Sequence, residues 1–89
     1  MRDENFDIPV TVATEQTGRF LTVTRTAQAA DFLLNRWPEH QRGTEYRSAL
    51  KAMMDVLEPR KTVSVGRKAF AAAAKKAKLL IREGRADAG

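Results

Sequence analysis

The sequence contains no cysteine and a single histidine, His40, among its 89 residues. Without thiols the chain can form no disulfide framework, no cysteine-ligated zinc site or iron–sulfur cluster, and no thiol nucleophile. One histidine makes a histidine-rich metal site or a Ser–His triad hard to assemble within one chain. No apolar run approaches the roughly 18–20 residues that span a bilayer. These absences favour one small soluble domain.

Charge is distributed unevenly along the chain. Residues 1–59 carry seven basic and nine acidic side chains, a net charge of −2, and residues 60–89 carry nine basic and two acidic side chains, a net charge of +7. The net charge of +5 therefore resides in the last third of the chain. Such asymmetry favours an acidic partner, whether nucleic acid, an anionic membrane surface or an acidic protein.

Alternating residues near the N-terminus predict a β-hairpin. Ile8, Val10 and Val12 recur with period two, and a second β-rich run covers residues 20–24 beyond a short turn. Pro9 has no amide hydrogen, so we expect the first strand to lie at a sheet edge or to begin irregularly.

Apolar residues three and four positions apart predict three helices, over about 26–37, 44–58 and 62–78. Residues 78–82 either finish the third helix or form a short last strand, and periodicity does not separate these alternatives. The expected order is ββααα(β). We expect an α+β fold in which the helices cover one face of a two- or three-stranded antiparallel sheet.

We expect one domain, residues 8–83, between a flexible lead-in at 1–7 and a flexible tail at 84–89. The acidic N-terminal residues lack the apolar core of a secretory signal. The cytoplasm is therefore the expected compartment.

The third predicted helix has one apolar face and one basic face. At 100° per residue its apolar positions share one arc, and its cations lie roughly opposite. A basic ridge suits contacts with nucleic-acid phosphates, whereas the alternative is a solvated face that only aids solubility. No stacking aromatic lies beside the ridge, which favours the solvated face, and no Trp or Phe cluster is placed to insert into a membrane. The ridge comprises Arg67, Lys68, Lys75, Lys78 and Arg82.

Basic residues also surround the predicted start of this helix, where free amides attract anions. The segment from Thr62 to Lys68 lacks the first glycine and the Gly-Lys-Ser/Thr ending of a phosphate-binding loop, so we exclude such a loop. The helix also lacks Asn and Gln, the residues that read adenine, so we do not expect sequence-specific DNA binding. The candidate contacts for an anionic partner are Arg60, Lys61, Arg67, Lys68, Lys75, Lys78 and Arg82.

No combination of residues predicts an active site. His40 follows Glu39 in a polar loop, and we interpret it as an exposed loop histidine because no nucleophile or second ligand is placed by spacing. Trp37 and Tyr46 close apolar stripes, which is typical of core anchors. We therefore expect a protein that is not an enzyme and that has no catalytic residue, bound metal or cofactor.

The pattern resembles the domain of unknown function 982 family over about residues 8–81. The matching residues are Pro9 to Val12, Gly18, Ala29, Ala30, Leu33, Leu34, Trp37, Pro38, Gly43, Tyr46, Ala49, Arg67, Phe70, Ala73, Ala74 and Ala77. Met53–Met54 and Glu58–Pro59 depart from the family pattern. The resemblance implies a small bacterial protein, mostly from rhizobia and related soil bacteria, and supports the expected order of elements. It implies no catalytic residues.

Arg67 is the one polar residue of the matched pattern outside the turns. We expect it to bridge to Asp55 or Glu58, and the alternative is an interaction residue.

Two hypotheses for function follow. In the first, the domain binds an unidentified protein or a second copy of itself, through the apolar hairpin face that contains Val10 and Val12 or through an edge strand. In the second, it binds nucleic acid non-specifically through the basic third helix. No membrane or metal partner is expected.

Overall fold

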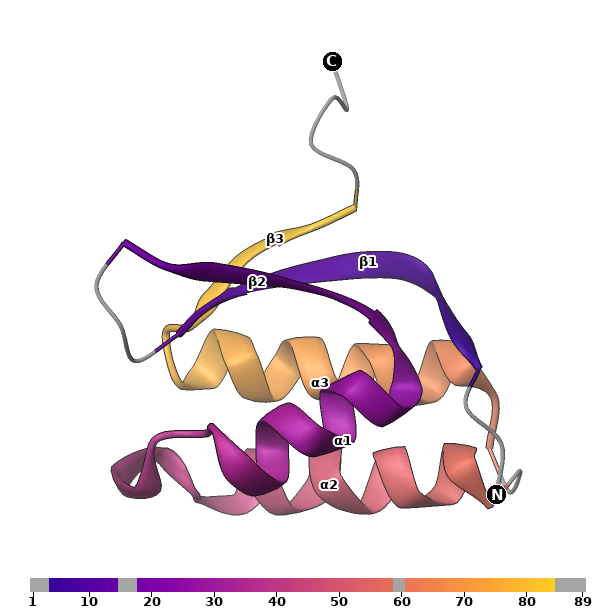
Figure 1. The fold of residues 1–89 in the computed structure, drawn as a ribbon. Helices are drawn as coiled ribbons and strands as arrows, with labels where there is room; N and C mark the ends of the chain where they lie inside the picture. Colours follow the sequence, from indigo (N-terminus) through magenta and orange to yellow (C-terminus); the bar gives the residue numbers. More distant parts are fainter. Residues whose placement is uncertain (1–3, 15–17, 59–60, 85–89) are drawn as a thin grey trace.

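The computed structural model describes residues 4–14, 18–58 and 61–84 of the chain. Three helices lie on one face of an antiparallel sheet, and no described element covers the other face (Figure 1). This arrangement confirms the α+β class and the order ββααα(β). The elements are β1 (Asn5–Ala13), β2 (Phe20–Arg25), α1 (Thr26–Asn35), the 3₁₀ helix η1 (Glu39–Gln41), α2 (Thr44–Leu57), α3 (Val63–Lys76) and β3 (Leu80–Glu83).

β1 is the central strand, because the strand order is β2-β1-β3. The expectation of an edge strand, drawn from Pro9, is therefore wrong, whereas the alternative of an irregular start describes what is found. The pairing of β1 with β2 shifts register between Asn5 and Val10, and Pro9 lies within this irregular segment. A proline at a bulge removes no regular hydrogen bond of the ladder, which explains why it is tolerated here.

β1 begins at Asn5, three residues before the expected start of the domain. The backbone amide and the hydroxyl of Thr26 both donate to the carbonyl oxygen of Glu4, each over 2.9 Å. These bonds fix the start of β1 beside the start of α1. The described part of the expected lead-in, residues 4–7, therefore belongs to the fold, and residues 1–3 lie outside the described residues.

Residues 80–83 form β3, which decides between the alternatives for this segment. α3 ends at Lys76, and Lys78 takes a φ of 62° that ends the helical path. The amide of Leu79 donates to the carbonyl of Ala74 over 2.8 Å, and the amide of Lys78 donates to that of Lys75 over 3.1 Å. This pair of bonds is a Schellman motif, in which glycine is the usual residue at the left-handed position. The motif turns the chain back along β1.

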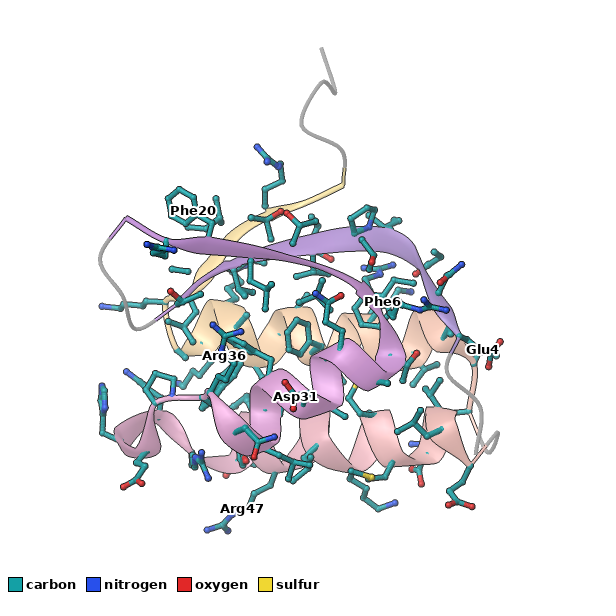
Figure 2. The ribbon with its side chains drawn as sticks, in the orientation of Figure 1. Glu4, Phe6, Phe20, Asp31, Arg36 and Arg47 are labelled. Carbon is teal, nitrogen blue, oxygen red and sulfur yellow. The ribbon has the colours of Figure 1, made fainter. Side chains whose placement is uncertain are left out.

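The core lies between the sheet and the helices and is built around linked aromatic rings. Phe32 lies 5.7 Å from Trp37 and 6.2 Å from Phe70, centroid to centroid, and Trp37 lies 5.7 Å from Tyr46. Phe6 points from β1 toward α3 and joins the same cluster (Figure 2). The burial of Trp37 and Tyr46 confirms both as core anchors.

Candidate interaction surfaces

Residues of β1 and β2 alternate between the core and an uncovered sheet face. Val10, Val12 and Val23 are fully buried toward the helices. Their neighbours along each strand therefore point the other way. We define the open face by the paired positions Thr11 and Thr22, Ala13 and Phe20, and Arg82, which pairs with Thr11. Thr11 itself is buried, at 4% exposed, so the accessible part of this face is formed by the other four positions. The hairpin face that was predicted to bind a partner is covered by the helices, and substitution of Val10 or Val12 would disrupt the core.

Phe20 is the most exposed large apolar side chain on the described part of the chain. It is 64% exposed and points away from the helices (Figure 2). Beside it, the hydroxyl oxygens of Thr11 and Thr22 lie 3.1 Å apart and hydrogen-bond to each other. Arg82 carries the one charge among the positions that define the open face. The face is thus nearly neutral on a chain of net charge +5.

The outer edge of β2 is occupied by a side chain. The amide of Thr24 donates to Gln28 Oε1 over 3.0 Å, and Gln28 Nε2 donates to the carbonyl of Thr22 over 3.3 Å. The side-chain amide of Gln28 thus takes the place that a further strand would take. Natural sheets cover their edges in such ways, which disfavours pairing with another chain along β2.

Arg67 is buried and connects three elements. Its Nε lies 3.2 Å from Asp7 Oδ1 and its Nη1 lies 2.7 Å from Glu83 Oε1, so α3 is tied to β1 and β3. Nη2 donates to Asp7 Oδ2 over 3.4 Å. The hydrogen bonds and the charge of Arg67 hold the pKa of the Asp7 carboxyl below its ordinary value. The bridge itself was expected, but its partners are not the expected Asp55 or Glu58.

Asp55 is paired differently. Its carboxylate lies 3.2 Å from Lys51 Nζ, one helical turn away, and 3.9 Å from Lys61 Nζ. Lys61, a candidate contact for an anionic partner, is therefore already beside a carboxylate.

The remaining candidate cations do not form a continuous ridge. Arg82 lies on the open face of the sheet, and Arg60 lies outside the described residues. Lys68 is exposed near the start of α3, about 10 Å along the helix from Lys75. Lys75 and Lys78 are exposed at the other end, together with Lys76, which sequence reasoning missed. The helical wheel grouped Arg67 with the exposed cations, because a wheel of α3 alone does not show that the sheet covers this side of the helix.

His40 is exposed in η1, as expected. Within residues 4–14, 18–58 and 61–84, no group of three or more His, Asp or Glu side chains is placed to hold a metal ion. No helix in this part of the chain is long and apolar enough to cross a membrane.

The sequence model of one family matches most of the chain. Its description is "Protein of unknown function (DUF982)", and it matches residues 8–81. No curated protein and no solved structure matches the chain. The matched segment begins within β1 and ends within β3, so it includes all three helices. The chain belongs to the DUF982 family.

Proposed function

We propose that this domain is a non-enzymatic interaction module of the bacterial cytoplasm that binds a second copy of itself through the open face of its sheet. The observation that carries the proposal is the exposure of Phe20, 64%, on a nearly neutral face. Burying a fully exposed phenylalanine side chain contributes about 1.5–3 kcal/mol, so burying the 64% of Phe20 that is exposed contributes about 1–2 kcal/mol in each copy of a symmetric dimer. Interface centres are typically enriched in aromatic residues and depleted of charge, and this face offers one exposed aromatic residue, Phe20, and one charge, that of Arg82.

Charge favours a second copy as the occupant. An acidic partner would meet few cations on this face, because Arg82 is the one charge among its defining positions. Two copies can therefore approach through this face without burying several unpaired charges, which would be costly. The net charge of +5 on each copy opposes their approach at long range, and salt screens this repulsion. Self-association should therefore strengthen as salt is raised, whereas binding to an acidic partner would weaken.

The size of the open face sets the expected affinity. Three strands spaced about 4.8 Å apart and about 20 Å long give a face of about 300 Å² in projection. Side chains that protrude from the sheet add to this area. Even so, the total surface that two copies would bury is at or below the lower limit of about 1,200 Å² for specific protein interfaces. We therefore expect a weak dimer, with a dissociation constant on the order of 10–100 μM.

Sedimentation velocity over about 10 μM to 1 mM tests the proposal. The unmodified protein should show a sedimentation coefficient that rises with concentration, and Phe20→Lys should remain monomeric. Leu34→Lys is the matched control, because Leu34 is 47% exposed on α1, outside the sheet. It should associate as the unmodified protein does.

Two results would overturn the open face as the interface. One is a monomer at every concentration. The other is equal association of Phe20→Lys and the unmodified protein, which would move the contact to another surface, such as the outer edge of β3 or a helical face.

The structure gives nucleic-acid binding less support than the sequence did. The five cations of the expected ridge are divided: Arg67 is buried against two carboxylates, Arg82 is on the sheet, and Lys68 is separated from the pair at the end of α3. Non-specific binding depends on several cations that contact successive phosphates together. We therefore put forward self-association alone.

A further inference from the structure

Three adjoining hollows lie on the helical side of the molecule, where η1 and the start of α2 meet the end of α3. Their volumes are about 530, 160 and 540 Å³. The first and second share His40, Gln41 and Ala77, and the second and third share Glu45 and Lys76. Neighbouring hollows share lining residues and therefore adjoin one another, and we call the three together the end groove.

One end of the groove is cationic. Lys75, Lys76 and Lys78 line the third hollow, where Glu45 is the one acidic lining residue. In the part of the chain that the structure describes, none of these three lysines lies within ion-pair distance of a carboxylate. Among the described residues, the contact that this charge makes is with the negative end of the α3 dipole, because Lys75 and Lys76 lie in the last turn of the helix.

The other end of the groove is partly apolar. Pro38 and Ala77 are buried, Leu79 is half-buried, and all three line the first hollow. The exposed imidazole of His40 lines the same hollow and offers a flat ring. The first and third hollows, at about 530 and 540 Å³, are within the range of about 300–1,000 Å³ that is common for ligand pockets. Such pockets combine apolar walls with a few polar groups, and the end groove has both.

The wall formed by η1 is held in place by hydrogen bonds. Trp37 Nε1 donates to the carbonyl of Gln41 over 2.9 Å, and the amide of Gln41 donates to that of Pro38 over 3.0 Å. Arg42 Nη2 donates to the carbonyl of Trp37 over 3.1 Å. Because Trp37 is a core residue, the segment that carries His40 is anchored before any ligand arrives, which lowers the entropy lost on binding.

Lys78 is both the left-handed residue of the helix ending and a lining residue of the third hollow. Its φ of 62° is the left-handed conformation that glycine normally occupies in this helix ending. A lysine is less favourable than glycine for the backbone at this position, and its ammonium group is brought to the cationic end of the groove.

We propose that the end groove binds a small organic anion, in which a phosphate or carboxylate group contacts Lys75, Lys76 and Lys78 and a flat apolar body lies against Pro38, Ala77 and Leu79 beside His40. This site goes beyond the proposed self-association and lies on the opposite side of the sheet from the open face. The two proposals can therefore fail separately.

Titrations followed by two-dimensional ¹H–¹⁵N NMR test this site, with phenyl phosphate and benzoate as anionic probes and inorganic phosphate and phenol as the separated halves. At least one aromatic anion should shift the amide signals of Gln41, Ala73 and Ala77. Its dissociation constant should be below about 1 mM and about tenfold lower than that of either half. Comparison of phenyl phosphate with benzoate identifies the preferred anionic group.

Two variants with the same charge change make the test specific. Lys76→Gln should weaken binding of the preferred probe by about tenfold, because Lys76 lines two of the three hollows. Lys68→Gln, on α3 but outside the groove lining, should leave binding unchanged. The proposal is overturned if neither aromatic probe shifts these signals at about 10 mM, if the shifts lie outside the groove, or if the two variants weaken binding equally.

Discussion

Arg67 forms ion pairs that join α3 to both β1 and β3, and replacing it tests how much these pairs stabilise the fold. We consider two substitutions. Arg67→Met keeps most of the apolar stem and removes the guanidinium, and Arg67→Ala removes both. Comparison of the two separates the contribution of the ion pairs from that of the buried stem.

The magnitudes follow from the exposure of the three side chains. The Arg67 side chain is 9% exposed, so its three methylene groups contribute about 2 kcal/mol at about 0.8 kcal/mol each. The side chains of Asp7 and Glu83 are 40% and 39% exposed, and solvent screening limits each pair to about 0.5–1 kcal/mol. We expect a loss of about 1–2 kcal/mol in the free energy of unfolding for Arg67→Met. For Arg67→Ala, which keeps Cβ and removes the other two methylene groups, we expect a loss of about 2.5–3.5 kcal/mol.

The effect of Arg67→Met should depend on pH in a defined direction. The pKa of Asp7 is lowered in the folded state from its ordinary value of 3.8. The pair with Asp7 therefore stabilises the folded protein above about pH 3.8, and this stabilisation is lost as the pH falls through the lowered pKa. The difference in stability between the unmodified protein and Arg67→Met should stay constant near neutrality and narrow below pH 3.8.

Urea denaturation followed by tryptophan fluorescence measures these differences, because Trp37 is the single tryptophan and is buried. If Arg67→Met matched the unmodified protein at pH 7, the ion pairs would contribute nothing. A difference that widened in acid would show that the pKa of Asp7 is not lowered by Arg67.

Three further substitutions test other parts of the fold by the same denaturation assay. An added Cβ at Gly66 would lie 2.7 Å from Val56 Cγ2 and 3.0 Å from Met53 Cε. The resulting overpacking, about 2 kcal/mol, should outweigh the gain of about 1 kcal/mol that alanine has over glycine within a helix, so Gly66→Ala should destabilise the protein by about 1 kcal/mol. A gain in stability of about 1 kcal/mol would show that α2 and α3 leave room for the added carbon. Lys78→Gly relieves the left-handed backbone and should stabilise the protein by about 0.5–1 kcal/mol, whereas a loss would contradict the assigned helix ending. Gln28→Ala removes the side chain that covers the outer edge of β2. The free energy of unfolding should fall by about 0.5 kcal/mol, and light scattering at high protein concentration should rise. If neither value changed, the edge would need no cover.

Local patterns in the sequence predicted most of the fold. Period-two alternation located the hairpin, and helical spacing located α2 and α3 to within about two residues. Pro38 correctly marked the region where α1 ends, since the helix stops at Asn35 and the chain continues into η1. These features depend on residues close in sequence, which is why pattern alone was sufficient.

Features that depend on distant residues could not be predicted in this way. Arg67 contacts Asp7 across 60 positions, and no local spacing links them. The central position of β1 depends on β3, which the sequence left undecided because residues 78–82 suit a helix or a strand. Pro9 correctly indicated that the pairing of β1 is irregular near its start, but it did not indicate whether β1 is a central or an edge strand.

The open face was missed for a related reason. Its composition follows from the pairing of Ala13 with Phe20, and this register is set by the length of the turn and by packing. The sequence showed Phe20 within a β-rich run, but it did not show that this residue lies on the opposite side of the sheet from Val10 and Val12. The structure shows that Phe20 is exposed, and this exposure is what points to the open face as an interaction surface.

The most direct measurement of the proposed interface uses the absence of native cysteine. A single spin label at Arg19→Cys, next to β2, is mixed with an unlabelled, ¹⁵N-enriched second copy, and broadening of amide signals in that copy is recorded. A dimer through the open face predicts selective broadening at Thr11, Phe20 and Thr22, and no such broadening from a label at Ser48→Cys on α2. Absence of broadening from the Arg19→Cys label, or equal broadening from both labels, would contradict the proposed interface.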